Sequence, residues 1–336
     1  MRRSLLIAFA ALILSSTSPH AQTGAEVVPA QPAPQGPETL MSEARARFDL
    51  RYDRIESDPR RQRLQGAIRL GVVIDVRDLV DVRVDASTGT RYTSRWSTLH
   101  DFEGGSPGEL PMFVRRLYLQ RRWGNVRAQL GAIPPIKGVA SSTGIEADGW
   151  IDGGRLEWST GRTIFELVVG GLHDLNTPNV FTREQHINYA ELEITHSVSE
   201  GLIAEISTEH FSEDTFVRGE LRWSGDRWLG GGFKAGVEGL TALERPTGIG
   251  GVTLGLSPLA WADRGWDRWL SLRVWYAHID RDMGRRGQLA DDFIQVGNAL
   301  SVFADGDITE TLGWFGRAVV SDSPRYTAGL SLRLKR

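Results

Sequence analysis

Apolar and polar residues alternate one by one over long stretches of the chain. Between residues 125 and 133, the apolar members of the alternation are Val126, Ala128, Leu130 and Ala132. Successive side chains of a β-strand point to opposite faces, so this period of two predicts a strand with one face for hydrocarbon and one for water. The preceding residues 112–122 predict a second strand, joined to the first by a tight turn at 123–125.

The same pattern recurs along the chain and predicts about sixteen strands, with fourteen or eighteen as alternatives. The predicted strands are 45–55, 62–76, 79–88, 112–122, 124–133, 149–158, 162–171, 186–197, 200–210, 214–224, 229–239, 249–257, 268–279, 291–304, 308–320 and 324–335. Charged residues recur on one face of many of them, and burying so many charges in a dry core would be prohibitive. We therefore predict an all-β fold, a transmembrane antiparallel β-barrel with a water-filled interior.

The first arm of the hairpin is less regular than the second. Arg115 and Arg121 share a face with its apolar residues, and we expect both to extend outward toward a membrane interface along their apolar stems.

The predicted connections alternate between long and short, as a barrel with both termini in the periplasm requires. The exceptions are 211–213 and 321–323, which are short where outside loops are expected, and 258–267, which is long where a turn is expected. Either the register is wrong there, or Trp261, Trp266 and Trp269 of the long connection lie in a periplasmic aromatic girdle.

The N-terminus has the form of a secretory signal peptide. Arg2 and Arg3 precede an apolar run that ends in small and polar residues near Ala21. Residues 22–41 are rich in Pro, Ala and Gln, which predicts a disordered periplasmic tail. The expected organisation is a signal peptide over 1–21, the tail over 22–41 and a barrel domain over 42–336.

Composition excludes several other classes of protein. The formal net charge is -3 with 24% charged residues, so there is no basic footprint for nucleic acid. The chain has no cysteine, which excludes disulfides, thiolate metal sites and lipid attachment through cysteine. Its 38 glycines and 11 tryptophans fit a β-rich, aromatic chain.

The hairpin 112–133 and the following residues 138–153 (GVASSTGIEADGWIDG) resemble the porin-type channels of Gram-negative outer membranes. In those channels an Arg-Arg-aromatic strand often precedes a glycine-rich return strand. Residues 313–318 (GWFGRA) are similar to late strands of carbohydrate-selective porins. The resemblance implies a sixteen-stranded pore with inward basic residues at a constriction, and it leaves a homotrimer open.

The candidate pore-lining residues are side chains of the hairpin and carboxylates of the loop 89–111. They are Arg116, Tyr118, Arg122, Arg127, Asp101, Glu103 and Glu109. Arginines that face carboxylates across a lumen create a transverse field that sorts solutes by charge. The alternative is that they are hydrated wall residues that hold the strand register. The loop itself either folds inward and narrows the lumen or packs its aromatic residues on one another.

Histidines in the second half of the chain raise a different function, an outer-membrane enzyme acting on lipid or lipopolysaccharide. The compact sets of histidine, serine and carboxylate lie at 196–200 and 210–213. Neither has a nucleophile elbow, and neighbouring side chains of a strand point to opposite faces. No metal-binding or phosphate-binding motif occurs, so we assign no catalytic residue, no cofactor and no metal.

The sequence thus predicts a channel in the outer membrane of a Gram-negative bacterium that passes small hydrophilic solutes by passive diffusion. We expect it not to be an enzyme. Its expected partners are outer-membrane lipids, lipopolysaccharide and the solutes, with no nucleic acid. A non-conducting barrel in export or assembly is the second alternative, and it would have a plugged lumen.

Overall fold

The computed structural model describes residues 41–57, 59–76, 79–92, 94–106, 108–135, 143–145, 148–172, 178–182, 186–228, 231–256, 266–290, 293 and 296–335. The chain divides into Met1–Glu38 and a second unit, Thr39–Arg336, which contains every described residue. The predicted signal peptide and nearly all of the predicted tail lie outside the described residues and stay predictions.

Strands make up most of the described chain. They are β1 (Met41–Ile55), β2 (Arg61–Val76), β3 (Val80–Ser87), β4 (Ser97–Asp101), β5 (Phe113–Trp123), β6 (Val126–Ile133), β7 (Ile151–Thr160), β8 (Thr163–Leu172), β9 (Tyr189–Ser199), β10 (Leu202–Phe211), β11 (Asp214–Trp228), β12 (Gly231–Ala242), β13 (Gly248–Leu256), β14 (Ser271–Ile279), β15 (Gly297–Asp307), β16 (Leu312–Val320) and β17 (Arg325–Lys335). Short helical segments in the connections are η1 (Val180–Thr182), η3 (Trp266–Trp269), η4 (Arg281–Met283) and α2 (Gly284–Gln288). Among the described residues, no helix is long and apolar enough to cross a membrane.

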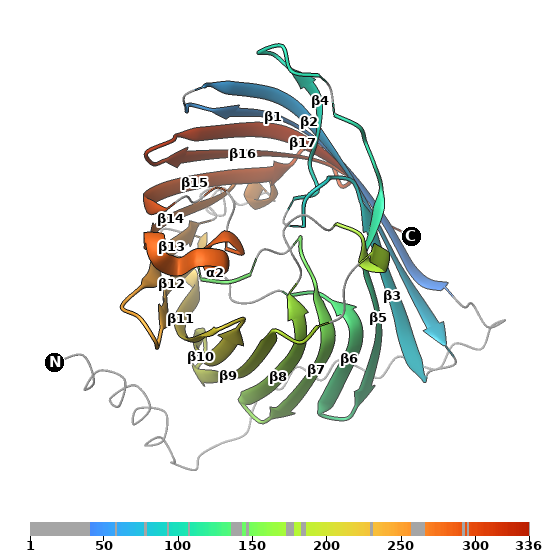
Figure 1. Ribbon diagram of the computed structural model, residues 1–336, viewed down its shortest axis with the longest axis vertical. Helices are drawn as coiled ribbons and strands as arrows, with labels where there is room; N and C mark the ends of the chain where they lie inside the picture. The colour runs from blue at the N-terminus through green and yellow to red at the C-terminus, as the bar shows by residue number, and fades with distance from the viewer. Residues whose placement is uncertain are drawn as a thin grey trace. The chain divides into compact units, whose positions relative to one another are not determined.

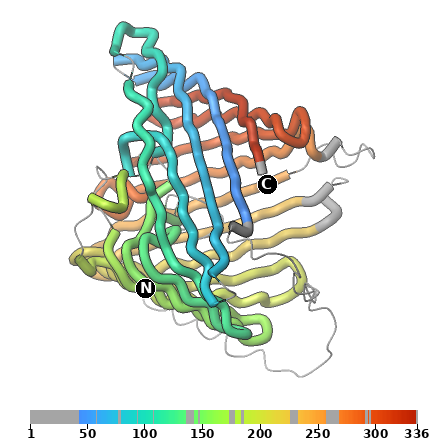
Figure 2. Tube along the Cα trace, turned by 90° about the vertical axis from the view of Figure 1, so that its right-hand side faces the viewer, coloured from blue at the N-terminus to red at the C-terminus, as the bar shows by residue number. Residues whose placement is uncertain are grey.

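Sixteen of these strands close into an antiparallel barrel. They pair with one another in chain order, and β1 pairs with both β2 and β17 (Figure 1). The remaining strand, β4, pairs with β2 from Arg63 to Gly66, outside the part of β2 that pairs with β3. Figure 2 shows the strands side by side around the wall. The predicted barrel and its strand number are confirmed.

The outer face of the barrel is apolar and the inner face is polar. On β1, Phe48 and Leu50 are 40% and 44% exposed, whereas Asp49 and Arg51 are each 4% exposed. The register carries this parity to the next strand, where Leu332 lies opposite Phe48. Exposed apolar side chains continue around the wall at Leu119, Leu130, Leu156, Leu192, Val237, Val252, Leu300 and Val320. Apolar residues outside and charges inside are the arrangement of a transmembrane barrel.

The connections differ in length between the two ends of the barrel. At the long-loop end they include 88–112, 134–150, 173–188 and 280–296, and at the short-turn end they include 124–125, 161–162 and 200–201. The exceptions that the sequence indicates are real: 212–213 and 321–324 are short, and 257–270 is long. Since the strands beside each exception lie close to their predicted positions, the predicted register is right there.

The prediction that Arg115 points outward is wrong. The pairing of β3 with β5 shifts between Asp85 and Ala86, and Arg115 is the extra residue of this β-bulge. The side chain of Arg115 is fully buried instead. Arg121 is exposed as expected, with its guanidinium 5.1 Å from the ring centre of Trp123.

The two faces of β5 offer a test of the barrel's orientation toward lipid. Leu119→Arg places a charge on the outer face and should destabilise the barrel by about 2–4 kcal/mol if the site lies near the middle of the bilayer. Gln120→Arg is the matched control, because this side chain lies on the inner face beside Gln129. Urea unfolding in lipid vesicles measures both variants. Equal losses of stability would contradict the assignment of the faces.

Candidate functional site

The inner face of the barrel has an excess of glutamate on one side and an excess of arginine on the other, where Asp49 and Asp53 pair with some of the arginines. A glutamate wall extends from β8 to β12 and consists of Glu166, Glu191, Glu193, Glu205, Glu209, Glu220 and Glu238. An arginine wall lies on β16, β17, β1 and β2 and consists of Arg317, Arg325, Arg333, Arg47, Arg51, Arg63 and Arg69. Because β10 is half-way round the ring from β1, the two walls face each other (Figure 1). Opposed charges of this kind set up a field across the lumen.

Arginines within the glutamate wall neutralise much of its charge. Arg218 pairs with Glu205 and Glu220, and Arg222 donates a hydrogen bond of 2.7 Å to Glu205. Arg218, Glu205 and Glu220 are almost completely buried. Charges so far from water are stable only when they are paired and hydrogen-bonded. The part of the glutamate wall around Arg218 is therefore dry and internally compensated. Nearer the short-turn end, the same side of the barrel lines a pocket of about 550 Å³ with Arg222, Lys234 and Arg273.

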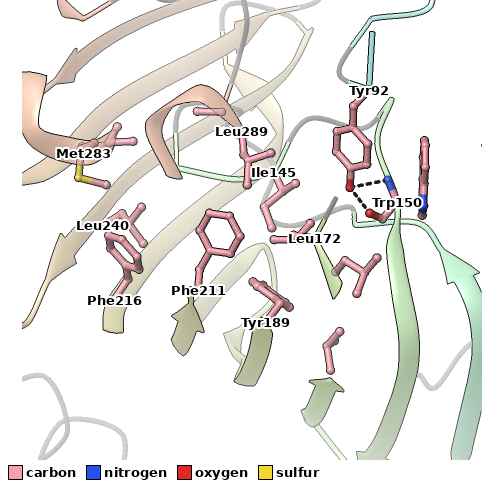
Figure 3. Packing of buried hydrophobic residues seen from close by; sticks show 14 of the residues in the cluster. Tyr92, Ile145, Trp150, Leu172, Tyr189, Phe211, Phe216, Leu240, Met283 and Leu289 are labelled. Carbon is pink, nitrogen blue, oxygen red and sulfur yellow. Dashed lines mark hydrogen bonds between the residues drawn. The ribbon is translucent and has the colours of Figure 1, made fainter. Parts of the chain in front are cut away.

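Two connections cover the glutamate wall at the long-loop end. Arg286 of α2 pairs with Glu209 on the wall and donates to the carbonyl of Thr143 at 2.7 Å. Figure 3 shows the apolar packing beside this contact. Ile145, Met283 and Leu289 of the two connections lie near Phe211, Phe216 and Leu240, which belong to strands β10, β11 and β12. All six apolar side chains are buried. The described parts of the two connections thus cover this side of the lumen at the long-loop end.

The arginine wall holds aromatic rings and a pocket. The Arg51 guanidinium carbon lies 4.0 Å from the ring centre of Trp96, and those of Arg317 and Arg325 lie 4.1 Å and 3.8 Å from the ring centre of Phe293. Such contacts stabilise both the cation and the ring. A pocket of about 290 Å³ lies here, and its lining also includes Arg47, Phe303, Asp305, Phe315 and Arg333. The chemistry of this pocket suits a small anionic or polar solute.

Buried Arg115 holds the inward part of the connection 88–112. Its guanidinium donates at 2.8–3.1 Å to the backbone carbonyls of Thr88, Gly89, Arg91, Tyr92 and Ser94. The Tyr92 hydroxyl accepts the Trp150 N–H at 2.9 Å and donates to the carbonyl of the same residue. Phe102, farther along, is exposed and packs on His100 with ring centres 4.7 Å apart. The loop thus reaches the inside of the barrel at Trp96, which lines the pocket, while narrowing of the lumen stays a prediction. Its residues Tyr92, Trp96 and Phe102 contact Trp150, Phe315 and Tyr52 outside the loop rather than one another.

Asp148 links this connection to the next one, 134–150. Its Oδ1 atom lies 2.8 Å from Arg95 Nε. Burial raises the pKa of Asp148, but the charges of Arg95, Arg69 and Arg115 outweigh this effect and hold the pKa below its ordinary value. The carboxylate is thus an ionic tie between two long loops.

The predicted pore arginines lie at different heights along the barrel. Arg116 is buried, and its Nε and Nη2 atoms donate to the Gly149 carbonyl at 3.1 Å and 3.0 Å. Arg122 and Arg127 lie opposite each other beside the turn 124–125, where Arg127 pairs with Glu157. Six residues of extended strand separate Arg116 from Arg122, a distance of about 20 Å. The three arginines therefore do not form a single ring.

The other predicted site residues lie at the long-loop end. Tyr118 is buried in the apolar cluster. Asp101 lies opposite Arg63 in the sheet, and Glu103 accepts the Gln62 N–H at 2.6 Å. Glu109, the third predicted carboxylate, is exposed on the same connection. The structure does not bring these carboxylates to Arg122 and Arg127, which lie at the short-turn end.

Several residues of the lumen escape sequence reasoning. Arg317 and Arg325 occupy inward positions of β16 and β17. Counting every second residue along these strands could have identified them. Arg286 and Phe293 lie in the connection 280–296, where no period applies. Nothing in the sequence marks their role.

The histidines considered for catalysis are not joined to serine. His196 Nδ1 lies 2.8 Å from Thr163 Oγ1, and His210 Nδ1 lies 3.4 Å from Thr215 Oγ1. In the described part of the chain, neither histidine hydrogen-bonds to a serine hydroxyl, so neither forms the expected nucleophile and base pair.

Asp148 makes the inward loops sensitive to acid. Its native pKa is lowered, so the stability it contributes is present above the unfolded pKa of about 4 and is lost as the pH falls through the native value. Amide exchange in residues 88–96, corrected for intrinsic rate, should therefore accelerate on acidification. Asp148→Asn should exchange quickly at neutral pH without this acid step, whereas Glu109→Gln, on an exposed site, should behave like wild type. An unchanged acid step in Asp148→Asn would contradict the assignment.

No protein-family model and no curated protein matches the sequence. Solved structures do match the fold. OpdL of Pseudomonas aeruginosa is 11% identical over 88% of this chain and 99% of its own, with a TM-score of 0.57. A mutant of the Rh. blastica porin is 10% identical over 88% and 100%, with a TM-score of 0.54. OprB of Pseudomonas putida is 9% identical over 87% and 91%, with a TM-score of 0.52. The chain has the fold of the Gram-negative outer-membrane porins.

Proposed function

We propose that this protein is an outer-membrane channel of a Gram-negative bacterium through which small hydrophilic solutes diffuse without cofactor or turnover. One observation carries the proposal: the closed ring has an apolar outer face and a charged inner face. The outer face needs hydrocarbon, and the charges inside need water or one another. A hydrated lumen through a membrane passes solutes that fit it. The porin fold supports the same function.

The proposed orientation places both termini in the periplasm. β1 begins and β17 ends at the short-turn end of the barrel. In bacterial outer-membrane barrels, short turns face the periplasm and longer loops face outward. The predicted signal peptide would direct export, and residues 22–41 would form a periplasmic tail.

We further propose that the channel favours anionic solutes. Arg47 and Arg333 pair with Asp49 and Asp307 at 2.7 Å, and their side chains are still 40% and 41% exposed. Most carboxylates of the opposite wall are buried. Guanidinium groups bind carboxylate and phosphate oxygens through two parallel hydrogen bonds. A solute in the pocket beside Trp96 therefore meets accessible positive charge.

We propose roles in the solute pathway for the residues predicted from the sequence, some at the short-turn end of the barrel and some at the long-loop end. Arg122 and Arg127 would line the short-turn mouth, where Arg122 is exposed. Arg116 and Tyr118 would support the wall at the long-loop end. Asp101, Glu103 and Glu109 would contribute negative potential at the outer entrance, where the last two are exposed. The homotrimer stays a prediction, which the mass of the protein in detergent solution would test.

The two alternative functions have less support. An enzyme would need a nucleophile and base in hydrogen-bond reach, which the contacts of His196 and His210 do not provide. An export or assembly component would need a plugged lumen, whereas a pocket of about 290 Å³ lies beside the arginine wall and is not filled by protein.

Conductance in planar bilayers tests the proposed function. Wild-type protein should give stepwise conductance, and a salt gradient should give a zero-current potential of the sign expected for anion preference. The double variant Arg47→Gln/Arg333→Gln, in which both residues lie opposite each other, should lose much of this preference.

The matched control is Arg121→Gln, because Arg121 is exposed beside Trp123 and does not belong to the arginine wall. A sealed wild-type barrel would reject the channel. If the barrel conducts but the double variant has the same ion preference as wild type, only the proposed role of the arginine wall is rejected.

A further inference from the structure

We propose that Arg286 is a positioning residue that holds two long loops over the glutamate wall and so confines permeation to the arginine side at the long-loop end of the lumen. This inference rests on the proposed channel function and adds to it a route and a residue that sets ion preference.

Arg286 connects three separate parts of the chain. Its side chain is buried and pairs with Glu209 of β10. The same guanidinium donates to the carbonyls of Thr143 at 2.7 Å and Gly144 at 3.0 Å. Arg286 itself belongs to α2 in the connection 280–296. One planar group thus joins the wall, the connection 134–150 and the connection 280–296.

A second contact holds the connection 134–150 to the same wall. The Thr143 hydroxyl accepts a hydrogen bond of 2.9 Å from Arg218 Nε and donates to Glu238. Thr143 is fully buried, and Arg218 and Glu238 nearly so. The backbone carbonyl and the hydroxyl of one residue are therefore both used to hold this loop against the glutamate wall.

Apolar side chains complete the seal around these polar contacts. Ile145, Met283 and Leu289 come from the loops and are 5%, 1% and 2% exposed (Figure 3). They lie against wall residues such as Phe216 and Leu240. Water and ions have no favourable path through a close-packed apolar layer.

At the long-loop end, the two sides of the lumen consequently differ in hydration, whereas the pocket of about 550 Å³ lies nearer the short-turn end. The side chains of Arg218 and Glu220 on the glutamate wall are 1% and 0% exposed. Arg47 and Arg333 on the opposite wall are each about two-fifths exposed. A permeating ion then meets the positive wall and is shielded from the negative one. Releasing the loops would widen the passage and expose the glutamates.

Arg286→Gln tests this inference, and Arg285→Gln is the matched control. Both variants remove one positive charge from α2. Arg285 is exposed, 5.8 Å from the ring centre of Phe211, and makes none of the hydrogen bonds to Glu209, Thr143 and Gly144 that Arg286 makes. Arg286→Gln should raise single-channel conductance and shift the zero-current potential toward cation preference. Arg285→Gln should leave both quantities near those of wild type.

Glu209→Gln separates loop release from a purely local change of charge. It deletes a negative charge, which by itself would strengthen anion preference. If it loosens the clamp, the other glutamates become accessible and the shift is toward cations, as in Arg286→Gln. Heat-modifiable migration on gels verifies that each variant is a folded barrel. If Arg286→Gln does not fold, Glu209→Gln decides the test.

If the wild-type protein conducts, and Arg286→Gln and Glu209→Gln have the same conductance and ion selectivity as wild type, the inference is overturned. The proposed channel function then still stands. A shift toward anions in Glu209→Gln would also overturn it. A wild-type barrel that does not conduct would overturn the proposed function and this inference together.

Discussion

The fold depends on the pairing of the first strand with the last. Residues 45–55 of β1 lie opposite residues 325–335 of β17 without a register shift. Inside a bilayer, an unpaired backbone group has no water to bind, so an open sheet edge would be prohibitively unstable. Closing the ring removes both edges. It also fixes the register of every strand, because a slip of one residue would turn the charged face toward lipid.

A closed barrel of this kind must then keep its inner charges stable. The arginine wall does so with water, with the buried carboxylates of Asp49 and Asp53, and with the faces of Trp96 and Phe293. The glutamate wall does so without water, through pairs such as Arg218 with Glu205. The desolvation of such a pair is offset only when its remaining donors and acceptors are satisfied. The same charge types thus give a hydrated surface on one side and a dry one on the other.

The inward loops are held by arginine in a chain that has no cysteine. Arg115 gathers carbonyls of the connection 88–112, and Arg286 joins two other connections to the wall. A guanidinium has five N–H donors in a fixed plane, which lets one side chain satisfy several carbonyls of an irregular loop. Backbone that would otherwise be buried without partners is stabilised in this way.

The sequence by itself determined the barrel, a strand number near sixteen and the recurrence of charged residues on one face of the strands, because alternation is a local property of extended chain. It did not determine which charges are hydrated. The bulge that buries Arg115 interrupts the alternation, and Arg286 lies in a loop with no period at all. Its partner Glu209 is distant in the chain and comes near only when the ring has closed and the loops have folded into it. The position of a loop inside a barrel depends on such distant contacts, so only the tertiary structure decided it.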